Sequence, residues 1–373
     1  MTLKVGIRGA GVSGLSLAHA ILQEIPDADI TLADIRAHLP NPSRSFCYFQ
    51  TTSAYSPIRA NTTWSNIKFS GPGFSRKIDC SLTPYTYLEG DYFFNEIIQY
   101  LLRAKVTFRW NCQSVEVGTD YLRIDDVPEK FDLVFDSAFQ VEDAEPTLWQ
   151  TFGGLWIESS SPIFEADTAT LMELTQSSAD SAVNFMYILP TSSCSGLVEH
   201  TSFSKKRQDA ATHLNQCNLW LSKYQNSGIR IIKEEYGNIP MGLNTKKIQF
   251  NSIGTSADAI RMATGYGYQN IQRQARILAK TASLLRNTSH RGTFPPIKTP
   301  KVSGSMLKFI DKTFLKALSV FPLQGTKLME QILANAPGPE LISFLAGDSS
   351  MINTLRVISK APKITMLKTL CYG

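Results

Sequence analysis

The chain has 373 residues, of which 43% are hydrophobic and 18% are charged. This is the composition of a globular protein with room for two domains, and it excludes fibrous and low-complexity proteins. The net charge of +5 is small, and no run of about 18 apolar residues predicts a helix that spans a membrane.

The N-terminus and the cysteines indicate where the protein works. The opening MTLKVGIRGAG lacks the basic, apolar and cleavage regions of a secretory signal, so we expect a cytoplasmic protein. The six cysteines form no C-x-x-C pair and have no histidine at metal-ligand spacing beside them. We therefore expect reduced thiols and no metal site.

The first predicted element is a buried strand over Val5–Ile7, followed by a glycine-rich turn and a helix. The turn contains Gly9, Gly11 and Gly14 in a G-x-G-x-x-G pattern that includes Val12 and Ser13. In this pattern the glycines allow a tight turn, close approach of a pyrophosphate, and close packing of helix on strand. The helix N-terminus then presents free N–H groups to the phosphates.

A second predicted strand ends at Asp34, 20 residues after Gly14, where an acid that binds a ribose is expected. Its carboxylate would repel a 2′-phosphate, which disfavours NADP at this site. We predict FAD rather than NAD because the pattern begins at the very N-terminus, as it does in two-domain flavoproteins.

The next elements are short. Residues 38–44 read as a loop, 45–51 as a strand or turn, and 64–71 and 76–83 as strands joined by a Gly-Pro-Gly turn. A helix is predicted over 90–104, and strands over 106–110, 114–117 and 131–135. Residues 1–145 are thus interpreted as the first part of an FAD-binding domain, with 45–85 as a possible contributor to the substrate side.

Residues 146–245 are mostly strand-like, with a helix near 209–224, and are predicted to form an inserted substrate domain. Residues 246–290 return to the FAD-binding domain, with a strand over 248–254 and a long helix over 268–286. The predicted fold class is therefore α/β: a Rossmann-like FAD-binding domain of the glutathione-reductase or hydroxylase type, with an inserted mostly β domain and a helical tail.

The tail, residues 291–373, is helical and basic. From residue 290 onward it carries eleven Lys or Arg against four Asp or Glu. Residues 305–321 are amphipathic: Met306, Ile310, Phe314, Leu318 and Phe321 form an apolar stripe, while the charged residues, Asp311 among them, lie elsewhere. Such a helix packs on a core or lies on an anionic lipid surface, and both alternatives stay open.

Five separated segments carry the remaining motifs: Tyr187–Pro190, Leu197–Thr201, Ile239–Gly242, Gly254–Ala257 and Ala263–Tyr266. In their order and spacing they resemble one family, the FAD-dependent lycopene cyclases of bacteria and plants. The resemblance covers nearly the whole chain in order.

The resemblance implies a reaction, a cofactor and a set of binding residues. A carboxylic acid protonates a terminal alkene of a polyene, the cation closes a ring, and a proton is lost without net redox change. Reduced FAD stabilises the charge, with NADH or NADPH as an external reductant. Besides the glycine-rich turn, the family pattern assigns Gly254, Ala257, Thr264, Gly265 and Tyr266 to the flavin.

Glu199 is the predicted acid. A glutamate protonates an alkene only when it is neutral, which requires a pKa raised by an apolar surrounding. His200 stands where the family usually has a second acid. It is interpreted as a base or as a partner near Glu199, although adjacent strand residues point to opposite faces.

The remaining candidates line the substrate pocket. They are Phe152, Trp156, Glu158, Tyr187 and Met241. The expected partners are a hydrophobic polyene or prenyl substrate and a membrane surface touched peripherally, but no nucleic acid. The alternatives are a cyclase of a non-carotenoid prenyl substrate, a flavin-dependent hydroxylase or prenyl reductase, and a flavin- or carotenoid-binding protein without activity.

Overall fold

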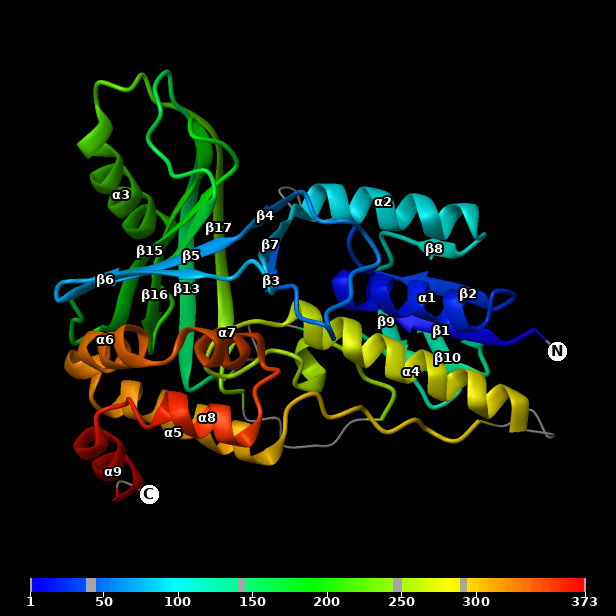
Figure 1. Ribbon diagram of the computed structural model, residues 1–373. Coiled ribbons are helices and arrows are strands. Elements are labelled where there is room, and N and C mark those ends of the chain that lie inside the picture. Colours follow the sequence, from blue (N-terminus) through cyan, green and yellow to red (C-terminus); the bar gives the residue numbers. More distant parts are fainter. Residues whose placement is uncertain (1, 38–44, 140–144, 244–249, 289–293, 372–373) are drawn as a thin grey trace.

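The computed structural model describes residues 2–37, 45–139, 145–243, 250–288 and 294–371. The described chain is a mixed α/β protein with a parallel sheet at one end and a larger, mostly antiparallel sheet at the other (Figure 1). The predicted loop over 38–44 and part of the strand predicted over 248–254 lie outside the described residues.

The parallel sheet contains β1 (Lys4–Arg8), β2 (Asp29–Ala33), β8 (Thr107–Arg109) and β12 (Leu133–Asp136), in the order β12-β1-β2-β8. In chain order this is 3-2-1-4 when read from β8, the order of doubly wound folds that bind dinucleotides. The strands β1, β2 and β12 are almost fully buried because both faces of the sheet are covered.

Three helices cover one face of this sheet: α1 (Val12–Glu24), α2 (Gly90–Arg103) and α4 (Tyr268–Thr288). A three-stranded meander covers the other face. It consists of β9 (Val115–Val117), β10 (Tyr121–Ile124) and β11 (Val127–Lys130). Helix α4 packs along α1, so a segment from far along the chain completes the N-terminal layer (Figure 1).

The large sheet has the order β17-β13-β16-β15-β14-β5-β6. Its strands are β5 (Asn66–Gly71), β6 (Phe74–Asp79), β13 (Leu148–Glu158), β14 (Thr168–Thr175), β15 (Ser181–Pro190), β16 (Ser195–Ser204) and β17 (Arg230–Met241). All neighbours are antiparallel except β14 and β5. Residues 66–79 therefore belong to the sheet that holds the predicted substrate residues.

One face of the large sheet is covered by α3 (Ala210–Leu221) and the 3₁₀ turn η1 (Ser222–Tyr224). The other face meets a small sheet of β3 (Phe46–Phe49), β7 (Tyr85–Leu88) and β4 (Thr62–Trp64). It also meets the helical tail, which contains α5 (Ser305–Val320), η3 (Pro322–Gln324), α6 (Gly325–Asn335), α7 (Gly338–Ala346), α8 (Met351–Ile358) and α9 (Lys363–Cys371).

Two sequence predictions need correction. The described part of the segment 248–254 makes only isolated bridges, Phe250 with Lys298 and Asp136 with Ser252, rather than a strand. In α5 the predicted apolar stripe matches the buried face only in part. Met306 of the stripe is exposed, as is Phe309, whereas Asp311, which lies off the stripe, is buried and forms an ion pair with Arg261 at 3.1 Å. The inward face of α5 is instead centred on Leu315 and Leu318.

Candidate functional site

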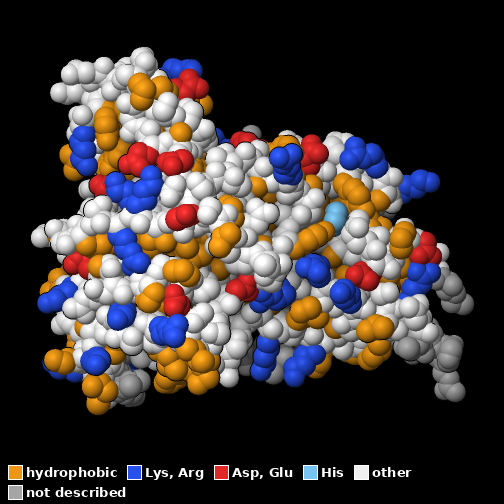
Figure 2. All heavy atoms as spheres, viewed as in Figure 1, with side chains coloured by type: hydrophobic (Ala, Val, Ile, Leu, Met, Phe, Trp, Pro, Cys, Tyr) orange, Lys and Arg blue, Asp and Glu red, His pale blue; other side chains and the backbone are white. Residues whose placement is uncertain are grey.

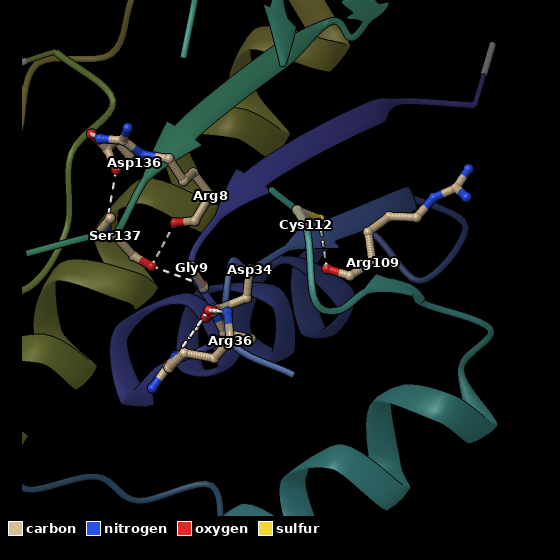
Figure 3. Close-up of polar contacts among 10 residues, drawn as sticks. Arg8, Gly9, Asp34, Arg36, Arg109, Cys112, Asp136 and Ser137 are labelled. Atoms are coloured by element: carbon tan, nitrogen blue, oxygen red, sulfur yellow. Dashed lines mark hydrogen bonds and ion pairs between the residues drawn. The ribbon is translucent and has the colours of Figure 1, made fainter. Parts of the chain in front are cut away.

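The turn after β1 is built as the glycine pattern predicts. Gly9 has φ +96°, and its N–H donates to the carbonyl of Ala33 on β2 at 2.7 Å. The hydroxyl of Ser137 donates to the carbonyls of Arg8 and Gly9 and fixes the turn from the β12 side (Figure 3).

The three glycines of the turn differ in how much space the fold leaves for a side chain. A Cβ on Gly14 would lie 2.0 Å from the carbonyl oxygen of Gly9, and a Cβ on Gly9 would lie 2.7 Å from the Ser137 hydroxyl. A Cβ on Gly11 would meet nothing nearer than Arg36 at 3.9 Å. The fold therefore needs Gly9 and Gly14. Gly11 leaves open space beside the N-terminus of α1, which has no side-chain cap. That space suits a phosphate group.

The carboxylate of Asp34 lies beside this turn and is already engaged. It accepts from the backbone N–H of Ala10 at 2.7 Å and from the guanidinium of Arg36 at 2.5 and 2.9 Å (Figure 3). Burial alone would raise the pKa of Asp34, but the bonds from Arg36 and Ala10 outweigh it and hold the pKa below its usual value. A bound ribose would therefore share Asp34 with Arg36.

The segment Gly254–Ala257 comes against the same helix. Gly254 has φ +93°, and a Cβ there would lie 2.3 Å from the hydroxyl of Ser13. Gln274 of α4 clamps the segment, because it accepts from the N–H of Gly254 at 3.0 Å and donates to the carbonyl of Ala257 at 2.8 Å. The buried hydroxyl of Ser256 has no partner among the described residues. The structure thus brings together the first glycine segment and Gly254–Ala257, and it leaves the hydroxyl of Ser256 in the second segment without a partner among the described residues.

Thr264, Gly265 and Tyr266 form a turn at the edge of the large sheet. Gly265 has φ +69°, and a Cβ there would lie 2.4 Å from the amide oxygen of Gln150. That buried oxygen has no hydrogen-bond partner among the described residues. The orphaned oxygen and the close glycine fit a ligand with N–H or O–H groups at this point.

Glu199 lies at the centre of the sheet face that meets the small sheet. Its neighbour in the ladder on β13 is Gly154, and Gly154 also pairs with Glu235 on β17. Paired residues point to the same face of a sheet, and neighbouring strands are roughly 4.8 Å apart. The Cα atoms of the two glutamates are therefore about 10 Å apart, with a glycine between them. Because Gly154 has no side chain, the two carboxyl groups can meet above it and share a hydrogen bond.

The two carboxyl groups differ in their surroundings. Glu199 is 7% exposed and accepts from the hydroxyl of Thr201 at 2.8 Å. Glu235 is half-buried on the edge strand and accepts from the indole N–H of Trp156 at 3.1 Å. Burial first, and then the neighbouring charge of Glu235, raise the pKa of Glu199 well above its usual value. Burial also raises the pKa of Glu235. Such a pair holds one proton where two isolated glutamates would hold none.

A cluster of aromatic hydroxyls adjoins this pair. Tyr187 is the partner of Glu199 on β15, and its hydroxyl lies 2.7 Å from that of Tyr85, which lies 3.0 Å from that of Tyr266. Burial raises the pKa of the nearby Cys47 thiol to about 12. Cys47, Tyr187 and Tyr266 are each half-buried, and burial raises the pKa of each of them.

Of the other predicted pocket residues, Trp156 and Phe152 lie near the two glutamates, whereas Met241 and Glu158 lie farther away. Trp156 contacts both Glu235 and the ring of Tyr87, 5.4 Å away, and Phe152 lies across Gly237 on the same face. Met241 is fully buried on this face but at the far end of β17, opposite Leu148. Glu158 is exposed and forms a surface ion pair with Arg230, so the structure does not bring it to Glu199.

His200 is placed away from Glu199. It points to the opposite face of the sheet, beneath α3, where its Nδ1 lies 2.9 Å from Nδ1 of His213. Burial lowers the pKa of both histidines to about 4, so both are neutral. The expected role of His200 as a base beside Glu199 does not fit this position, because the backbone of β16 separates the two side chains.

A hollow of about 390 Å³ lies between residues 52–55 and helix α4. It is lined by Tyr55, Gln272, Arg273, Arg276 and Lys280, among others. None of the predicted substrate residues lines it. Among the described residues, no group of three or more His, Cys, Asp or Glu could hold a metal ion. No described helix is long and apolar enough to cross a membrane.

The fold belongs to a class seen in solved structures of low sequence identity. The halogenase PltM is 11% identical, with a TM-score of 0.54 over 92% of this chain and 81% of that one. The 2-methyl-3-hydroxypyridine-5-carboxylic acid oxygenase is 12% identical, with a TM-score of 0.52 over 99% and 96%. CtdE, solved in complex with FAD, is 11% identical, with a TM-score of 0.50 over the full length of both chains.

The family is defined by sequence. The family described as lycopene cyclase protein matches residues 5–371, which is almost the entire chain. The chain therefore belongs to the lycopene cyclase family. No curated protein matches it significantly.

Glu235 is the main functional candidate that the sequence analysis missed. It lies four residues before the Ile239–Gly242 segment and reads as one of several charges at a strand edge. The available signal was Gly154 in the middle of a strand, since a glycine there often marks close approach of other groups.

Proposed function

We propose that this protein binds FAD and cyclises a polyene terpenoid without net oxidation, most simply lycopene to a carotenoid with a β-ring. The observation that carries the proposal is the buried Glu199–Glu235 pair over Gly154, because it keeps a carboxylic acid neutral beside aromatic groups. Membership of the lycopene cyclase family supports the substrate class.

The residues of the glycine-rich turn, Asp34 and Gly254–Ala257 fit a dinucleotide. Gly11 and the N-terminus of α1 would hold the pyrophosphate, and Asp34 with Arg36 the ribose. The orphaned polar atoms of Ser256 and Gln150 would be available for hydrogen bonds to the remainder of such a ligand. When bound and reduced, FAD supplies electron density that stabilises positive charge.

The proposed chemistry conserves atoms and electrons. The Glu199 carboxylic acid donates its proton to the terminal C=C bond and becomes a carboxylate. The cation is attacked by the neighbouring C=C bond, which closes a six-membered ring. Loss of one proton then restores an alkene, so the product is an isomer of the substrate.

Glu235 and the aromatic groups have separate tasks in this scheme. Glu235 shares a proton with Glu199 and can return one to it, because it is half-buried and closer to solvent. The ring faces of Trp156 and Tyr187 can face a cation, which aromatic quadrupoles attract. The apolar side chains around them exclude water that would trap the cation.

The test uses purified protein with reduced FAD and lycopene, without oxygen, in deuterated water. The proposal predicts a product of lycopene's formula apart from incorporated solvent deuterium, and no product from Glu199→Gln. Glu158→Gln, at a surface ion pair, should behave as the wild type. An unchanged rate in Glu199→Gln would remove Glu199 as the acid.

The second candidate is a flavin-dependent redox enzyme, such as a hydroxylase or prenyl reductase. It is favoured by the likeness of the fold to an oxygenase and a halogenase. A strict oxygen requirement, or a product that gains two hydrogens, would establish it in the same assay. If lycopene is inert but shorter prenyl polyenes cyclise, the substrate is a non-carotenoid terpenoid.

A further inference from the structure

The outer side of the helical tail combines protruding apolar side chains with lysines. Helix α5 packs against α9, and Thr365 of α9 donates to the side chain of Gln324 in η3 at 2.8 Å. We call the outer side of α5, η3, the first turn of α6 and α9 the tail surface. Its exposed apolar residues are Phe309, Val320, Leu323, Ile364 and Leu367.

These apolar side chains are far more exposed than packing would leave them. Leu323 is 70% exposed, Ile364 72% and Phe309 62%. Figure 2 shows orange apolar side chains interspersed with blue ones along the lower left of the molecule, where Figure 1 places α5, α6 and α9. Several large apolar residues exposed together mark an interaction site rather than an ordinary surface.

The charge of the tail surface has one sign. Its exposed lysines are Lys312, Lys327, Lys363 and Lys368, and none of them makes an ion pair with a described residue. The four acids of the tail are directed elsewhere. Asp311 is buried against Arg261, Glu340 pairs with Arg356, and Asp348 pairs with Arg273. The carboxyl oxygen Oε1 of Glu330 is buried beside Gly71 of β5.

We propose that the tail surface docks on a lipid bilayer that contains anionic headgroups. Lysines attract anionic headgroups, and their apolar stems can lie along the bilayer while the ammonium groups stay in the interface. The apolar side chains between them would enter the boundary between headgroups and acyl chains.

Two other occupants fit less well. A second copy of the chain would bring the same unpaired lysines face to face across a twofold axis, which is repulsive. Protein interfaces in general are depleted in lysine at their centres, whereas here lysines alternate with the apolar residues. Charge complementarity therefore favours the lipid surface.

The inward side of helix α5 packs against the large sheet. Leu315 and Leu318 of α5 pack into the core that also contains Phe185 and Leu197 of the large sheet. A single layer of helices, roughly 10–12 Å thick, would thus separate the bilayer from the sheet face that carries Glu199. The docking itself does not depend on the reaction proposed above.

The test is sedimentation of the full-length protein with vesicles of phosphatidylcholine alone or with about one-third phosphatidylglycerol. We expect binding to the anionic vesicles that weakens as salt is raised. The double variants Lys363→Glu/Lys368→Glu and Ile364→Ser/Leu367→Ser should each lower the partition coefficient at least about tenfold. Because all four residues are exposed, their thermal unfolding should match the wild type.

Matched controls lie away from the tail. Lys105→Glu/Lys130→Glu reverses two exposed lysines near the parallel sheet at the other end of the molecule (Figure 1), and Leu219→Ser removes a 65% exposed leucine of α3. Both should leave vesicle binding unchanged. The proposal is overturned if the wild type ignores anionic vesicles, or if the controls weaken binding as much as the tail variants do. It is also overturned if the tail variants dissociate a dimer without changing vesicle binding.

Discussion

Glu199 and Glu235 meet over Gly154, the residue of β13 that pairs with both of them. They come from strands β16 and β17, which do not touch each other in the sheet. A buried and a half-buried carboxyl group meet on one face, with Tyr187 and Trp156 beside them, and they are the strongest chemical feature of the described chain.

The pH dependence of activity should report this pair. A reaction that needs neutral Glu199 loses rate as pH rises through the pKa of Glu199. Glu235→Gln keeps the hydrogen bond but removes the neighbouring negative charge that helps to raise this pKa. The pH at which half the activity is lost should therefore move to a lower value, measured as a profile of kcat against pH. Glu234→Gln, on the same strand but the opposite face, is the control. An unmoved profile in Glu235→Gln would show that the two groups are not coupled.

Gly154 should resist any side chain. In Gly154→Ala the new Cβ would lie 2.8 Å from Leu197 Cδ1 and 3.1 Å from Glu199 Cβ, so the strand or Glu199 must shift. We expect a loss of about 1–3 kcal/mol in the free energy of unfolding, together with a loss of activity. Gly73→Ala, where a Cβ meets nothing within 4 Å, should change neither. Urea unfolding and the cyclisation assay measure the two effects, and a fully active Gly154→Ala would contradict the close approach.

The glycine-rich turn predicts opposite results at two positions. In Gly14→Ala the Cβ would clash with the Gly9 carbonyl at 2.0 Å, and the free energy of unfolding should fall by at least about 3 kcal/mol. In Gly11→Ala the protein has room, so thermal unfolding of the apoprotein should barely change while FAD affinity falls. Fluorescence titration with FAD measures that affinity. Wild-type affinity in Gly11→Ala would mean that the phosphates bind elsewhere.

The Arg261–Asp311 ion pair should stabilise the packing of tail helix α5 against the segment that precedes α4. Both side chains are 3% exposed, and Arg261 also donates to the carbonyls of Phe344 and Leu345. Asp311→Leu leaves a buried charge without its partner and should cost about 3–5 kcal/mol of unfolding free energy. The double variant Arg261→Met/Asp311→Leu should lose less than the sum of the two single variants.

The control for this pair lies at the surface. The ion pair of Glu158 with Arg230 is more than half exposed on both sides, so Glu158→Gln should cost under about 1 kcal/mol by the same urea titration. Additive losses at Arg261 and Asp311 would indicate that the two side chains do not interact.

The sequence by itself determined the local features. The strand, turn and helix around Gly9 and Gly14 follow from glycines and apolar residues close together in the chain, and the structure has them where the pattern predicts. Helices α2 and α4 likewise begin and end within about two residues of the ranges read from their apolar periodicity. Glu199 was predicted from the sequence, but the burial that raises its pKa is a property of the tertiary structure.

Only the tertiary structure decided which distant residues meet. Strand register put Gly154 between Glu199 and Glu235 and sent His200 to the opposite face, and register depends on pairing across dozens of residues. The same holds for α5, where the helical pattern alone placed Asp311 off the apolar stripe and Met306 on it. The burial of Arg261 requires a carboxylate partner, and that requirement turned Asp311 inward and left Phe309 outside.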